Sequence, residues 1–221
     1  GPGDTASSHR GQQRTRRRRG ERGMQTILNR CDIMCDETCG AMMVTVGSNV
    51  PNFEMEAYEP ASRDFGKVSL AKLMKAKKWT ILVFYPADFT FVCPTEIAAF
   101  GKLDKEFKAR DAQLLGVSID SEFVHHAWRV AKDELRDLPF PMLSDIKREL
   151  SQALGILDAD AGVAQRATYI VDPAGIIRFV YVTDLNVGRS PQEVLRVLDA
   201  LQTDELCPCN WQPGDDTLQA A

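Results

Sequence analysis

The stretch TILVFYPADFTFVCPTE, residues 80–96, decides the fold that this sequence predicts. Its first six residues, Thr80–Tyr85, form a continuous apolar run with the length of a buried strand. A turn follows, and after it comes the helix-like stretch Thr95–Lys108. Cys93 is therefore expected at a strand-to-helix junction.

The next segment repeats this rhythm. Gln113–Ile119 is a second apolar run, Asp120-Ser121 offers a helix N-cap, and Glu122–Leu135 fits a helix. Strand and helix in alternation are typical of an α/β sheet. His125 and His126 lie on this second helix, where we expect packed or hydrogen-bonded side chains without a catalytic role.

The C-terminal half predicts an antiparallel hairpin and a capped helix. Arg166–Val171 and Ile176–Val182 flank the turn sequence DPAG at 172–175. Residues 190–193, SPQE, form a capping box with proline at the first helical position, and an apolar face follows.

Composition bounds the class of protein. The chain has 221 residues, of which 44% are hydrophobic, and can bury one substantial core. It contains no apolar run long enough to cross a bilayer, and its Arg-rich start lacks the apolar region of a secretory signal. We therefore expect a soluble, cytoplasmic protein.

Charge is distributed unevenly. Residues 1–23 carry +5 of a net charge of −4, which leaves −9 on the remainder and predicts no nucleic-acid-binding surface there. The run RTRRRR, Arg14–Arg19, could bind nucleic acid or an anionic membrane, but a solvated tail is the favoured interpretation. The chain is expected to divide into a disordered extension (1–41), a globular domain (42–202) and a mobile arm (203–221).

Cys93 has the position of a reactive thiol. In the first turn of a helix it faces unsatisfied backbone N–H groups and the positive end of the helix dipole, and both favour the thiolate. Pro94 is tolerated there, and Thr90 could hydrogen-bond the sulfur or an incoming peroxide. The alternative is a buried cysteine that only fills space.

The pattern Pro86-x-x-x-Thr90-x-x-Cys93 resembles the active-site signature of the peroxiredoxin family. The resemblance extends from about Val44 to Leu218. Within the family, SIDSEF (118–123), LSDIKRELSQ (143–152) and DELCPCNW (204–211) resemble the mycobacterial-type alkyl hydroperoxide reductase subunits C.

This resemblance implies a thioredoxin-like α/β fold, in the peroxiredoxin variant with a C-terminal redox arm. It identifies Cys93 as the peroxidatic cysteine and gives Thr90 and Pro86 the role of shaping its pocket. Arg166 matches the arginine that stabilises the thiolate, and Glu96 matches a residue that orients this arginine. A guanidinium keeps its proton and can also hydrogen-bond the peroxide.

The resemblance also assigns the two cysteines of the arm. Cys207 matches the resolving cysteine, usually supplied by the other subunit of a dimer, and Cys209 matches an additional redox cysteine of the subgroup. Pro208 between them stiffens the link. A metal site in the tail is the alternative, although two thiolates supply half of a tetrahedral zinc shell. The chain lacks the Gly-Gly-Leu-Gly and Tyr-Phe elements of overoxidation-sensitive relatives, which implies resistance to excess peroxide.

The implied function is a thiol-dependent peroxidase for hydrogen peroxide and organic hydroperoxides, acting through a sulfenic acid and an intersubunit disulfide without a metal or other cofactor. A homodimer, assembled into a ring of dimers, would be reduced by a thioredoxin-like, AhpD-like or flavin-dependent protein. Neither a nucleic acid nor a membrane is an expected partner. The alternatives are a dithiol oxidoreductase, disfavoured because residue 96 is Glu rather than Cys, and a ring-forming holdase.

Three further cysteines, Cys31, Cys35 and Cys39, lie outside the resemblance. Their spacing of four would align them on one helical face, where they could hold a metal or cluster or exchange disulfides. No histidine lies between Cys31 and Val44 to complete a familiar site, and incidental cysteines are the favoured interpretation.

Overall fold

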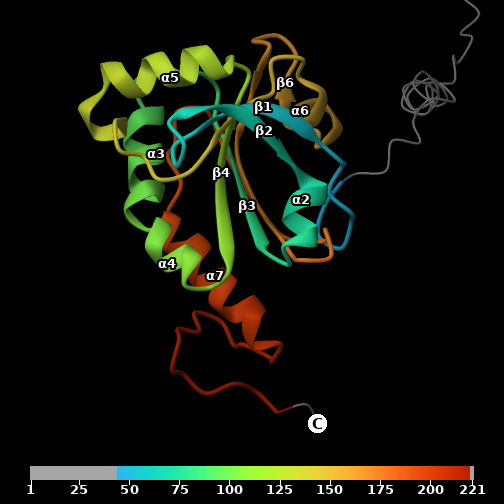
Figure 1. Cartoon of the computed structure of the whole chain (residues 1–221). Coiled ribbons are helices and arrows are strands. Elements are labelled where there is room, and N and C mark those ends of the chain that lie inside the picture. The colour runs from blue at the N-terminus through green and yellow to red at the C-terminus, as the bar shows by residue number, and fades with distance from the viewer. Residues whose placement is uncertain (1–43, 220–221) are drawn as a thin grey trace, which may run out of the picture. The chain divides into compact units, whose positions relative to one another are not determined.

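The structure is a computed structural model that describes residues 44–219. Seven strands form a mixed sheet in the order β2-β1-β5-β4-β3-β8-β9 (Figure 1). Their bounds are β1 Glu54–Glu59, β2 Asp64–Ser69, β3 Trp79–Phe84, β4 Ala112–Ser118, β5 Met142–Ser144, β8 Arg166–Val171 and β9 Ile177–Thr183. The short strands β6 Leu157–Asp158 and β7 Val163–Ala164 pair with each other.

Helices cover both faces of this sheet (Figure 1). Their bounds are α2 Leu70–Lys75, α3 Cys93–Lys102, α4 Asp104–Lys108, α5 Glu122–Ala131, the 3-10 helix η1 Asp133–Leu135, α6 Glu149–Ala153 and α7 Pro191–Thr203. None of these helices of residues 44–219 is both long and apolar enough to cross a membrane.

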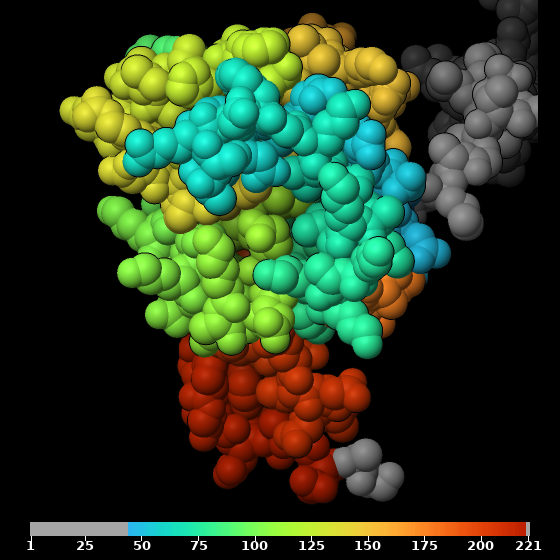
Figure 2. All heavy atoms as spheres, viewed as in Figure 1, coloured from blue at the N-terminus to red at the C-terminus, as the bar shows by residue number. Residues whose placement is uncertain are grey.

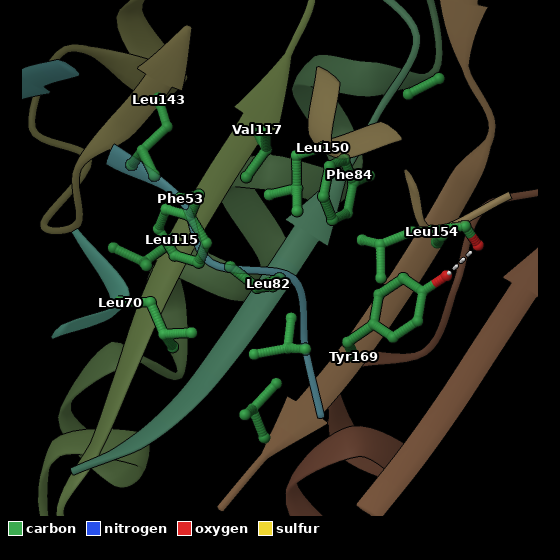
Figure 3. Packing of buried hydrophobic residues seen from close by; sticks show 14 of the residues in the cluster. Phe53, Leu70, Leu82, Phe84, Leu115, Val117, Leu143, Leu150, Leu154 and Tyr169 are labelled. Carbon is green, nitrogen blue, oxygen red and sulfur yellow. Dashed lines mark hydrogen bonds between the residues drawn. The ribbon is translucent and has the colours of Figure 1, made fainter. Parts of the chain in front are cut away.

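The alternation of side chains along β3 explains the two layers. Leu82 and Phe84 point to one face, in a buried cluster with residues of α2 and α6 (Figure 3). Ile81 and Val83 point to the other face, in a cluster with residues of α3, α5 and α7. Because both faces are covered, the strand is continuously apolar, which is the pattern expected of a central strand.

The strand predictions are confirmed within one residue at their ends. β3 and β4 pair in parallel, and β8 and β9 form the predicted antiparallel hairpin. In its turn, the Asp172 carboxylate accepts hydrogen bonds from the amides of Ala174 and Ile176. Gly175 has φ of 84°, a conformation that glycine adopts without strain.

Two helix predictions differ from the structure. The stretch predicted as one helix over 95–108 begins at Cys93 and is interrupted at Leu103, where α4 starts with acidic residues in its first turn. Acidic residues stabilise a new helix start through the dipole. The helix predicted over 122–135 ends at Ala131, because Lys132 has an extended backbone.

The last helix begins as predicted, with the Ser190 hydroxyl accepting from the amide of Glu193. The Glu193 carboxylate, however, pairs with Arg196 instead of closing a capping box. The arm after α7, which the sequence analysis predicts to be mobile, packs against this helix in the structure. Arg196 donates to the carbonyl of Trp211, whose side chain is buried, and Leu206 bridges to Leu218.

Candidate active site

Cys93 is the first residue of α3 and is fully buried. The eight residues from Tyr85 to Val92 connect it to the carboxyl end of β3. Val92 is the N-cap residue, and Pro94 occupies the first turn as predicted, where its missing N–H removes no hydrogen bond. The sulfur therefore lies at the positive end of the helix dipole, which favours a thiolate.

Arg166, the first residue of β8, reaches this sulfur. β8 runs antiparallel to β3 with Ala167 opposite Phe84, so Arg166 lies beside the end of β3 that leads to Cys93. Its Nη1 donates to Cys93 Sγ at 3.3 Å. Its Nε donates to the carbonyl of Leu185 at 2.7 Å, which fixes the direction of the guanidinium.

Glu96 lies one turn along α3 and joins Arg166 to a second arginine. Its Oε2 accepts from Arg166 Nη1 at 3.2 Å and from Arg189 Nη2 at 2.7 Å. Its Oε1 accepts from the Arg189 amide at 2.7 Å and from Arg189 Nε at 2.8 Å. Burial alone would raise the pKa of Glu96, but these hydrogen bonds and charges outweigh it and lower the pKa.

This cluster has an excess of positive charge. Arg166 and Arg189 are both buried guanidinium groups, and Glu96 is one carboxylate between them. The remaining positive charge lies next to Cys93 and would be neutralised by its thiolate. An uncompensated buried charge is costly, so an anion at this position would be favourable.

Arg189 was not predicted from the sequence. Besides its bonds to Glu96, its Nη1 donates to Thr168 Oγ1 at 3.0 Å, and its guanidinium lies over the ring of Phe100. The sequence offered only its position before the N-cap Ser190, and 93 residues separate it from Glu96. Nothing in a local pattern connects two residues so far apart.

The loop before Cys93 carries the other two predicted pocket residues. Pro86 is partly exposed, and the Thr90 hydroxyl donates to the Ala87 carbonyl at 3.0 Å. The lone pairs of Thr90 Oγ1 can still accept a hydrogen bond from the O–H of a hydroperoxide. Phe89 between them has φ of 57°, so the loop turns sharply at this point.

A buried polar network, also missed from the sequence, anchors this loop. The Asp88 carboxylate accepts from Tyr85 Oη at 2.7 Å and lies 2.8 Å from His125 Nδ1, and burial raises the pKa of Asp88. His125 Nε2 lies 3.0 Å from the Leu143 carbonyl and donates to it, because a carbonyl can only accept. The expectation of a hydrogen-bonded His125 is confirmed.

The two arm cysteines lie beyond the end of α7 that is remote from Cys93. The N-terminal end of α7 is fixed beside Cys93 by Arg189, whereas Gln202 at its other end donates to the carbonyl of Arg110, just before β4. The 13 residues of α7 span about 20 Å. Cys207 follows this end; it is partly exposed, and Cys209 is exposed.

Two other predictions concern residues outside the structure. Cys31, Cys35, Cys39 and the run Arg14–Arg19 lie outside the described residues. Within residues 44–219, no group of three or more His, Cys, Asp or Glu side chains is arranged to hold a metal ion.

Comparison with known proteins gives a consistent result. The AhpC/TSA family matches residues 46–180, and the C-terminal domain of 1-Cys peroxiredoxin matches residues 201–221. Alkyl hydroperoxide reductase C of Mycobacterium tuberculosis is 55% identical over 188 residues, which cover 80% of this chain and 95% of that protein. The corresponding protein of Mycolicibacterium smegmatis is 53% identical over the same shares.

Solved structures agree with these sequence relatives. The structure of Mycobacterium tuberculosis AhpC superimposes with a TM-score of 0.70 at 53% identity, over 77% of this chain and all of that chain. The reduced 2-Cys peroxiredoxin of Plasmodium vivax superimposes with a TM-score of 0.73 at 39% identity, over 78% of this chain and 91% of that chain. The thioredoxin-like fold predicted from the sequence is confirmed.

Proposed function

Because the chain belongs to the AhpC/TSA family of peroxiredoxins and is a cysteine-dependent peroxidase, we propose that Cys93 is its peroxidatic thiolate. The observation that carries this assignment is the excess positive charge of the Arg166, Glu96 and Arg189 cluster, 3.3 Å from the sulfur. The helix start adds backbone N–H groups on the same side.

The proposed first step is attack of the Cys93 thiolate on the terminal oxygen of hydrogen peroxide or an organic hydroperoxide. The S–O bond forms as the O–O bond breaks, and the leaving oxygen takes a proton and departs as water or an alcohol. The sulfur is oxidised to a sulfenic acid while the peroxide is reduced. Arg166 is positioned to stabilise the negative charge that moves from sulfur to the leaving oxygen.

The second step is condensation of this sulfenic acid with the thiol of Cys207, which forms a disulfide and releases water. A disulfide requires Cα atoms within about 7 Å of each other. Because α7 separates Cys93 from Cys207 of the same subunit, the thiol is supplied by a second subunit. Since Cys93 is fully buried, the first turn of α3 has to open for this step.

A thiol reductant completes the cycle by exchange with this disulfide. The reductant is thioredoxin-like, AhpD-like or flavin-dependent, and it attacks at the exposed arm that holds Cys207 and Cys209. The enzyme is a homodimer, assembled into a ring of dimers, that acts in the cytoplasm in antioxidant defence. These assignments follow the resemblance to the mycobacterial reductases.

The decisive experiment compares single-turnover peroxide consumption by reduced wild type, Cys93→Ser and the double variant Cys207→Ser/Cys209→Ser. Cys93→Ser should lose the reaction, whereas the double variant should reduce one equivalent of peroxide and then stop with a trappable sulfenic acid. Peroxide consumption by Cys93→Ser at the wild-type rate would refute the proposal. Circular dichroism of each variant controls for folding.

A thiol-independent holdase remains the second candidate. Phe91 is 97% exposed and Phe123 is 61% exposed, and such apolar side chains could contact an unfolded client. Cys93→Ser separates the two functions, because a holdase would still suppress client aggregation after peroxidase activity is lost.

A further inference from the structure

Three arginines are buried in the described part of the chain: Arg129, Arg166 and Arg189. Arg166 and Arg189 share the carboxylate of Glu96. Arg129, which is only 4% exposed, makes no ion pair with any described carboxylate. Buried charges in proteins are normally paired, because an unpaired one loses hydration without compensation. Arg129 therefore lacks a counter-charge that its burial requires.

The contacts of Arg129 leave part of its guanidinium without a partner. Nη2 donates to the carbonyl of Leu138, and the guanidinium lies 5.0 Å from the centre of the Tyr58 ring. Nη1 is buried and has no hydrogen-bond acceptor among the described residues. Burial lowers the pKa of Arg129, but a guanidinium stays protonated at neutral pH. Nη1 thus remains without an acceptor, and Asp137, whose negative charge acts on the guanidinium from a greater distance, forms no ion pair with it.

Arg129 lines a cavity of about 530 Å³, within the size range of small-molecule sites. The cavity lies between the turn of the β1–β2 hairpin, the end of α4, α5 and the segment that follows η1. Figure 2 shows the hairpin (cyan) lying against the α5 region (yellow-green) and the segment after it (yellow). Arg129, a buried cation, is therefore part of the wall of a cavity.

The other charges of the wall are also mainly positive. Arg63, Lys108 and Arg136 line the cavity with Arg129, and Asp137 is the one acidic residue among the described residues that line it. Lys108 and Arg136 are paired with carboxylates outside the cavity. Arg63 makes no ion pair with a described residue. The net positive charge comes from Arg129 in the wall and Arg63 in the hairpin turn.

We propose that this cavity binds a small oxyanion, a carboxylate or a phosphate, with the Arg129 guanidinium as the central cation. The planar fork of an arginine matches both groups, and an anion in the cavity would place a counter-charge beside the guanidinium. About half of the wall is apolar, with Tyr58, Val130 and Leu138 among its residues, so a short organic acid would fit as well as inorganic phosphate. This site is separate from Cys93 and does not depend on its proposed role.

The test is isothermal titration of the full chain with sodium phosphate and, separately, with sodium butyrate, at constant ionic strength. Wild type should bind one ion per subunit saturably, and its melting temperature should rise with ligand concentration. Arg129→Lys keeps the charge but loses the fork and should weaken binding about tenfold, which corresponds to about 1.4 kcal/mol. Arg63→Ser should also weaken binding, and it should leave the packing around the buried Arg129 unchanged because Arg63 lies in the hairpin turn.

Lys75→Met provides the matched control for Arg63→Ser, because Lys75 is exposed on α2 and both substitutions remove one positive charge. Its binding should equal that of wild type. Binding of phosphate alone identifies an inorganic ligand, and preference for butyrate identifies an organic acid; either supports the site. The proposal would be overturned if neither anion binds saturably at concentrations up to about 10 mM, which is about tenfold above the dissociation constant of a weak, 1 mM site. Equal binding by Arg63→Ser and wild type would also overturn it, even if Arg129→Lys fails to fold.

Discussion

Arg166 Nη1 lies 3.3 Å from Cys93 Sγ and 3.2 Å from Glu96 Oε2, so one nitrogen joins the Cys93 sulfur to a buried carboxylate. Glu96 in turn is bound by Arg189 through both oxygens. The position of the charge beside the sulfur is therefore set by a chain of contacts through three elements, α3, β8 and the start of α7.

Replacing Arg166 with Met should slow attack on peroxide by about ten- to a hundredfold, since a hydrogen bond to a charged group contributes about 1.5–3 kcal/mol. Stopped-flow kinetics would measure this rate. Arg178→Met, which removes a partly exposed arginine at the end of β9 remote from Arg166, serves as control. An unchanged rate of peroxide attack in Arg166→Met would exclude Arg166 from the site.

Replacing Glu96 with Gln should lower the free energy of unfolding by about 3–5 kcal/mol at neutral pH, because two buried guanidinium groups lose their counter-charge. The pKa of Glu96 is lowered in the folded protein from its ordinary value of 4.5. Its contribution is therefore present above that value and is lost as pH falls through the folded pKa. Urea denaturation at a series of pH values, from neutral to acidic, should show that the free energy of unfolding depends less on pH in the variant than in wild type.

The matched control for this prediction is Glu193→Gln, which breaks the more exposed pair with Arg196. Surface pairs contribute about 0–1 kcal/mol, so the control should stay near wild type. If Glu96→Gln and Glu193→Gln lower the free energy of unfolding equally, burial of the Glu96 ion pairs does not increase their contribution to stability.

Replacing Arg189 with Met should lower the stability of the protein. It should slow peroxide attack less than Arg166→Met does, because Arg189 acts on the sulfur only through Glu96. Arg189→Lys should not restore stability, since lysine cannot form the bidentate pair. Stopped-flow rates and urea midpoints would be measured on the same variants. Full rescue by lysine would mean that charge alone, and not geometry, is required.

The two arm thiols should partly replace each other. After stoichiometric peroxide, wild type should form an intersubunit Cys93–Cys207 disulfide, and Cys209 should capture Cys93 when Cys207 is replaced by Ser. A subsequent excess of peroxide should rapidly form sulfinic acid only in the double variant Cys207→Ser/Cys209→Ser, because its sulfenic acid meets no thiol. Non-reducing electrophoresis and mass mapping would show this. Equal sulfinic acid in wild type, Cys207→Ser, Cys209→Ser and the double variant would refute the mechanism.

The sequence by itself determined the local parts of this protein. The run Thr80–Tyr85, the turn at 172–175 and the Ser190 cap each depend on residues close together in the chain, and each forms as predicted. The motif from Pro86 to Cys93 is also local, and it led to the prediction that Cys93 is the reactive cysteine. Helix ends were less certain, because the break at Leu103 depends on charges and packing beyond the apolar pattern.

Only the tertiary structure decided how distant residues meet. Arg189 and Glu96 form the core of the site although 93 residues separate them, and Asp88 and His125 meet across 37 residues. The lack of a counter-charge at Arg129 and the separation of Cys93 from Cys207 by α7 are equally invisible in the chain. Local structure follows from backbone propensity and the spacing of apolar residues, whereas these contacts depend on which strands pair and which helix faces pack.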